Sequence, residues 1–144
     1  MRIEYANMIM EEKIKLYSQK AIATATILGG PLAAGFLIRR NSLNLGRKGE
    51  GLIVLIIAII STILLFWGIL SIPESTIDKI PSLLIPFLNG GIAYLVVELM
   101  HGKILKKHKE ENNEFYRTGR EVVVALICCA IYFGIYFTVF YKII

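Results

Sequence analysis

Long runs without a charged residue divide this chain and limit the folds open to it. Twenty-three uncharged residues separate Glu50 from Glu74, and twenty separate Glu121 from Lys142. The hydrocarbon core of a membrane is about 30 Å thick, and about 20 residues of helix cross it. Segments 52–71 and 121–141 are therefore each predicted to form a membrane-spanning helix.

The composition agrees with a membrane protein and excludes other classes. Of the 144 residues, 56% are hydrophobic and 19% are charged, against about 45–50% and about 25% in soluble domains. The apolar content excludes a disordered chain. The two cysteines are adjacent, so they cannot staple a disulfide-dense secreted fold. The length excludes a soluble enzyme of several domains, and one membrane domain over 1–144 is predicted.

A third segment, 80–100, is uncharged between Lys79 and Glu98 but contains helix breakers. Pro81 suits a first helical turn, where its missing N–H costs nothing. Further along, Pro86 and an Asn-Gly-Gly triplet are expected to bend the helix, with neighbouring helices satisfying the freed backbone groups. The triplet residues are Asn89, Gly90 and Gly91.

The remaining segment, 21–38, is rich in Ala, Thr and Gly and breaks at Gly29, Gly30 and Pro31. Such residues insert weakly into lipid by themselves. Small residues recur at a spacing of four, the pattern that lets membrane helices approach closely, and Gly35 belongs to the same small-residue surface. Two structures fit this segment: a kinked, tightly packed span, or a re-entrant hairpin folded at the Gly-Gly-Pro sequence.

The distribution of basic residues predicts an orientation. The connections 39–51 and 101–120 are both basic and are expected in the cytoplasm, which places the C-terminus outside. The N-terminus lies outside if 21–38 crosses the membrane and inside if it is re-entrant. Within 101–120, helix is expected to continue toward Lys109. Anionic lipid headgroups are the expected partners of Arg39, Arg40, Lys103, Lys106, Lys107 and Lys109, and no nucleic acid is expected despite the basic balance.

Residues 1–19 have the pattern of an interfacial amphipathic helix, with apolar side chains beside Lys13 and Lys15. Three acidic residues in this segment argue against a signal peptide.

No catalytic motif is recognisable, so the chain is not expected to be an enzyme and no cofactor is predicted. Glu98 and His101 have the Glu-x-x-His spacing of di-iron bundles. A single pair makes only a weak metal candidate, and a polar pair at the cytoplasmic interface is the preferred interpretation. His108 is expected to face water or headgroups. Cys128 and Cys129 are interpreted as small packing residues in the last span.

Residues 25–41, ATILGGPLAAGFLIRRN, together with Tyr17-Ser18 and Phe115-Tyr116, resemble a group of small bacterial integral membrane proteins that have no assigned activity. The resemblance implies a multi-pass protein of the bacterial inner membrane and implies nothing about mechanism.

The sequence thus predicts an all-α membrane bundle of four segments. Segment 21–38 needs protein on all sides if it is broken at membrane depth, which favours a homo-oligomer or a partner subunit. Asn89, Thr24, Thr26, Ser61 and Thr62 are the polar residues nearest mid-membrane, and no ionisable group lies there, which disfavours coupled transport. Two functions remain: a pore or membrane-permeability effector, and a membrane anchor or accessory subunit that docks a soluble partner through 101–120.

Overall fold

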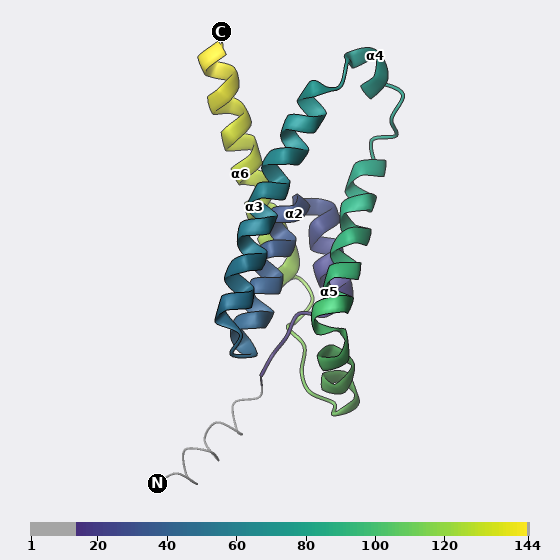
Figure 1. The fold of residues 1–144 in the computed structure, drawn as a ribbon, viewed down its shortest axis with the longest axis vertical. Coiled ribbons are helices and arrows are strands. Elements are labelled where there is room, and N and C mark those ends of the chain that lie inside the picture. The colour runs from purple at the N-terminus through teal and green to yellow at the C-terminus, as the bar shows by residue number, and fades with distance from the viewer. Residues whose placement is uncertain (1–13, 144) are drawn as a thin grey trace.

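The computed structural model describes residues 14–143, and this part of the chain is an all-α bundle (Figure 1). Within it no strand forms, and a single parallel bridge joins Leu16 to Phe115. Four helices are long and apolar enough to cross a membrane, and α4 is a short turn of helix between two of them. The helices are α2 (Gln19–Asn44), α3 (Lys48–Ser71), α4 (Glu74–Ile77), α5 (Leu84–Glu110) and α6 (Arg120–Ile143).

Helix α2 is a hairpin of two helical arms joined at Gly30, whose backbone is not helical. In Figure 1 the first arm rises beside α5, the chain turns at mid-height, and the second arm descends to the start of α3. Arms 19–29 and 31–44 are about 16 and 21 Å long at about 1.5 Å per residue. Each arm is therefore shorter than the hydrocarbon core of a membrane, which is about 30 Å thick.

Hydrogen bonds at the open end of the hairpin show that the chain folds back. A straight helix would separate Tyr17 from Asn41 by about 36 Å. Instead the Tyr17 N–H donates to Asn41 Oδ1 at 2.7 Å, and Asn41 Nδ2 donates to the Tyr17 carbonyl at 2.9 Å. Of the two structures expected for 21–38, the re-entrant hairpin is therefore the one that forms.

We call the end of the molecule that holds 14–18, the α2–α3 connection and the start of α6 the base, and the opposite end the far end (Figure 1). Helices α3, α5 and α6 run between these ends, and the last turns of α5 extend beyond the base. The far end carries the α3–α5 connection, with α4, and the C-terminus.

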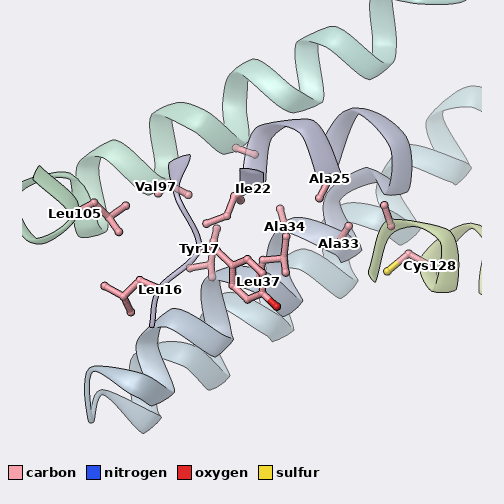
Figure 2. Packing of buried hydrophobic residues seen from close by; sticks show 13 residues of the cluster. Leu16, Tyr17, Ile22, Ala25, Ala33, Ala34, Leu37, Val97, Leu105 and Cys128 are labelled. Atoms are coloured by element: carbon pink, nitrogen blue, oxygen red, sulfur yellow. The ribbon is translucent and has the colours of Figure 1, made fainter. Parts of the chain in front are cut away.

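The hairpin holds the other helices together. Extensive contacts join α2 to α3, to α5 and to α6, whereas in the described part of the chain the three long helices have few contacts with one another. The buried cluster accordingly centres on the hairpin (Figure 2), where Ile22 and Ala25 of the first arm lie near Ala33 and Leu37 of the second. Val97 from α5 and Cys128 from α6 complete the cluster.

Three glycines permit these three helix contacts. A Cβ on Gly29 would lie 2.8 Å from Cα of Ala125 in α6, and one on Gly35 would lie 2.3 Å from Cβ of Ala58 in α3. On the α5 side, a Cβ on Gly90 would lie 2.5 Å from Cγ1 of Ile27. Close backbone approach through small residues is the usual way in which helices associate in lipid, where the hydrophobic effect supplies no attraction between them.

One expected feature of the span 80–100, a helix with Pro81 in its first turn, is wrong. The helix starts at Leu84, so Pro86 rather than Pro81 lies in the first turn, where a proline is tolerated. The triplet from Asn89 to Gly91 does not break α5, which is continuous to Glu110. Glycine costs a helix only about 1 kcal/mol, and packing of Gly90 on the hairpin offsets that cost. The continuation of helix toward Lys109 is confirmed.

The predicted interfacial helix 1–19 falls mainly outside the described residues. Its end, 14–18, is extended rather than helical, because this strand-like segment pairs its backbone with other segments. The Tyr116 N–H donates to the Leu16 carbonyl at 2.9 Å. Ser18 then starts α2, accepting from the Ala21 N–H with its side chain at 3.2 Å.

Replacing Gly90 by leucine tests the close approach of α5 to the hairpin. Gly90→Leu forces the side chain into Ile27, and overpacking of this kind costs about 1–3 kcal/mol. Thermal unfolding of the purified protein in detergent should show a clear loss of stability. Gly91→Leu is the matched control, because a Cβ on Gly91 meets nothing within 4 Å. Equal melting temperatures for the two variants would contradict the packing described here.

Candidate functional site

The tip of the hairpin requires the Gly-Gly-Pro sequence. Gly30 has φ 64° and ψ −169°, a combination essentially limited to glycine. Pro31 follows as the first residue of the second arm, where its fixed φ and missing N–H suit a helix start. Gly29 must lack a side chain because α6 packs against it. Each of the three predicted break residues thus has its own physical role.

Helix α6 covers one side of this tip. Cys129 Sγ donates to the Leu28 carbonyl at 3.0 Å, which satisfies one of the carbonyls freed where the first arm ends. The Tyr132 hydroxyl lies over Gly30, 3.0 Å from the place that a Cβ would take. That hydroxyl is buried, close to Thr62 and to the backbone of Leu32.

The other side of the tip borders a groove of about 450 Å³ between the hairpin, α3 and α5, which we call the tip groove. Its walls are mainly apolar. Three polar side chains reach it, one from each element: Thr26, Ser61 and Asn89. Thr26 is satisfied by the Ile22 carbonyl at 2.7 Å, but Ser61 and Asn89 form no hydrogen bond within the described part of the chain. The remaining lining residues are Pro31, Ala34, Gly35, Ile38, Val54, Ile57, Ala58, Leu64, Leu65, Ile92, Ala93 and Val96.

A network of polar residues closes the hairpin at the base. Asn41 is fully buried and pairs with both backbone groups of Tyr17. Asn44 Nδ2 donates to the Lys15 carbonyl at 2.7 Å and to the Tyr116 hydroxyl at 3.1 Å. This amide network fixes 14–18 against the second arm and thereby holds the two arms together.

His101 belongs to the same buried layer. It is 1% exposed, and its Nε2 lies 3.4 Å from Ser42 Oγ and 3.5 Å from Glu50 Oε1. Both partners are on one nitrogen, while Nδ1 has no partner among the described residues. A serine–histidine–carboxylate relay needs its two partners on opposite nitrogens. The cluster instead connects the hairpin to α3 and α5.

Glu98 and His101 do not form the metal pair that their spacing allowed. The Glu98 carboxylate accepts a hydrogen bond from Gln19 Nε2 and lies 3.5 Å from Lys106 Nζ. It therefore points to the start of α2, whereas His101 points to α3. Over the described residues, no group of three His, Cys, Asp or Glu side chains is placed to hold a metal ion.

The expectation that His108 faces water or headgroups is wrong. It is buried rather than directed to water, its Nε2 lies 3.0 Å from the Glu114 carbonyl, and its ring packs edge-on against Phe115 at 5.0 Å. The loop after α5 folds back along the helix and covers this face. A periodic helix face could reveal that His101 and His108 share a side, but not that a loop returns over it.

The predicted headgroup residues lie at or beyond the base. The lysines of α5 are exposed on its extension, namely Lys103, Lys106, Lys107 and Lys109. Arg40 is exposed near the start of α6, and Arg39 is half-buried. Asn41, Ser42 and Glu50 were not predicted as structural residues, because each is an ordinary polar residue in or beside a basic connection.

Comparisons with known proteins add no further assignment: no family, no curated protein and no solved structure matches the chain. Its four long apolar helices are those of a small multi-pass membrane protein, and one of them is folded into a hairpin at the centre of the bundle.

Asn41 should be essential for stability. Asn41→Leu leaves the buried N–H and carbonyl of Tyr17 unpaired, at about 1–3 kcal/mol for each group. Thermal unfolding in detergent should show a large loss of stability. Asn113→Leu is the control, since the Asn113 side chain bonds only to exposed Glu111 and its loss should change little. A stable Asn41→Leu protein would contradict the role of this residue in closing the hairpin.

Proposed function

We propose that the protein is a homo-oligomeric membrane protein in which the tip groove of each copy borders a permeation pathway. The observation that carries the proposal is the pair Ser61 and Asn89, which face the groove without a hydrogen-bond partner among the described residues. A polar group left unpaired in hydrocarbon costs several kcal/mol. Water, or a polar group from another copy, is therefore the favoured occupant beside them.

The backbone break at Gly30 supports the same conclusion. Irregular backbone at membrane depth is stable only where protein or water surrounds it. Helix α6 covers one side of the tip, but the other side opens onto the groove through Pro31. A second copy placed over this opening encloses the break between mainly apolar walls, and apolar constrictions occur in channels, where they gate by dewetting.

The charge distribution supports an orientation with the base in the cytoplasm. Twelve of the fourteen described Lys and Arg residues lie at the base or on the α5 extension, and only Lys79 and Lys142 lie toward the far end. The positive-inside rule then places the C-terminus outside. By the same proposal the protein resides in a bacterial inner membrane. It acts without catalysis, because Ser42, the serine beside His101, is fully buried in a cluster that joins helices.

A second function, an anchor for a soluble partner, has one observation of its own. The extension of α5 carries four exposed lysines beyond the base. An acidic surface of a soluble protein is a complementary partner for such a helix. Under this alternative, replacing Lys103, Lys106, Lys107 and Lys109 by glutamine releases a co-purifying subunit while the membrane part keeps its thermal stability.

Permeability is tested by reconstituting the purified chain in liposomes and following ion and dye release. We expect leak from the wild-type protein and at least a several-fold lower leak from Asn89→Leu, because leucine removes the polar group from the groove. Gly91→Leu, on the same helix but in open space, is the control and should leave the leak unchanged. Absence of leak in every lipid composition would exclude the pore.

Orientation is tested with reporter fusions at both termini. Green fluorescent protein should fluoresce on the N-terminus and not on the C-terminus, and alkaline phosphatase should be active only on the C-terminus. The termini are expected on opposite sides of the membrane, because three helices cross it and the hairpin does not. Phosphatase activity at the N-terminus would be incompatible with a cytoplasmic base.

A further inference from the structure

A second groove, of about 530 Å³, runs between the second arm of the hairpin and α6 on a different side of the molecule from the tip groove. Its volume is in the range of about 300–1,000 Å³ that is usual for ligand sites. One end is cationic and aromatic, and the rest is apolar. The lining residues are Tyr17, Phe36, Leu37, Arg40, Tyr116, Arg120, Val123, Val124, Ile127, Cys128 and Ile131.

The cationic end of this groove contains Arg40 and Arg120. Neither guanidinium forms an ion pair with a carboxylate in the part of the chain that the structure describes. The carboxylate of Glu121 is buried nearby and accepts a hydrogen bond from the Gly119 N–H at 3.2 Å. Two arginines that converge without a protein counter-ion form a site for an anion.

The aromatic rings at this end are held in place. Tyr17 and Tyr116 stack with ring centroids 4.4 Å apart, and Arg120 lies over the Tyr116 ring at 5.0 Å. Burial acts to raise the pKa of the Tyr116 phenol, but hydrogen bonds from Asn44 and Arg40 and the charges of Arg40 and Arg120 outweigh it, and the pKa is lowered. The charges of Arg40 and Arg120 at the mouth of the groove thus both act on the Tyr116 hydroxyl.

The apolar part leads from this mouth toward the middle of the membrane. Val123, Ile127 and Ile131 succeed one another at intervals of four along α6, so they form one row on its surface. Phe36 and Leu37 form the facing wall on the hairpin. Arg40 and Arg120 are at the base, whereas Ile131 lies about three turns further along α6. The groove is therefore cationic at the base and apolar further along α6, which matches a phospholipid with its anionic headgroup at one end and its acyl chains at the other.

We propose that this groove binds one anionic phospholipid per chain, with the phosphate on Arg40, Arg120 and the Tyr116 hydroxyl and one acyl chain along the row from Val123 to Ile131. The ligand is amphiphilic because the anion site and the apolar row are continuous. The exposed lysines of α5 lack such a wall, so they attract headgroups without selecting one lipid. This site does not depend on the proposed pore, since it lies on the opposite side of the hairpin's second arm.

The test measures lipid retention by native mass spectrometry of the full-length protein in detergent. Phosphatidylglycerol, phosphatidylcholine and glycerol phosphate are each added at equal concentration. We expect one phosphatidylglycerol per chain, retained at least tenfold better than phosphatidylcholine, together with a rise in melting temperature because the ligand binds only the folded state. Glycerol phosphate should bind at least tenfold more weakly than the lipid, since it cannot use the apolar row.

Variants separate the two parts of the site. The double variant Arg40→Gln with Arg120→Gln should lose at least tenfold in phosphatidylglycerol affinity. Ile127→Ser should weaken lipid binding several-fold and leave glycerol phosphate binding unchanged. Arg117→Gln removes one exposed arginine outside the groove; it is the control for loss of surface charge and should bind as wild type.

Three results would overturn the proposal. Equal retention of phosphatidylcholine and phosphatidylglycerol would remove the anion selectivity. Equal binding of glycerol phosphate and phospholipid would show an anion patch without an acyl groove. An Arg117→Gln variant that loses as much affinity as the double variant would show diffuse attraction by surface charge. Each variant is first compared with wild type in thermal unfolding, so that misfolding is recognised before binding is measured.

Discussion

The close approach of the hairpin backbone to three surrounding helices is the contact on which this structure depends. Gly29, Gly35 and Gly90 each remove a Cβ at the point where α6, α3 or α5 meets the hairpin. In lipid, helices gain nothing by hiding apolar side chains from water, so association rests on packing and on satisfied polar groups. Because the three long helices have few contacts with one another, the hairpin must form for the bundle to form.

The hairpin also depends on contacts at the base, where hydrogen bonds hold its two arms together. Asn41 bonds both backbone groups of Tyr17, and the layer that includes Ser42, Glu50 and His101 joins this region to α3 and α5. These polar residues lie at the base, and the small apolar interior at the tip is free of charge. The two grooves then differ in character: one has unpaired polar groups beside the tip of the hairpin, and the other has arginines at the base.

The sequence predicted the four apolar segments and the break at Gly29–Pro31 because hydrophobic length and helix breakers are local properties. It did not predict that α5 stays continuous through Asn89–Gly91, because the cost of glycine there is offset by packing against Ile27, a residue distant in the chain. It also placed His108 in water, since no periodicity shows that the loop holding Phe115 returns over that face. The sequence did not predict that Tyr17 and Asn41 form a pair.

The sequence by itself determined the environment of the helices, because uncharged runs of twenty residues or more must lie in lipid. The basic residues that flank these runs predict an orientation. What only the tertiary structure decided is the path of the first segment. Residues 21–38 are compatible with a kinked span and with a hairpin, because Gly30 permits either direction after the break. The hydrogen bonds between Tyr17 and Asn41, residues far apart in the chain, select the hairpin, and such a contact has no signature in local sequence.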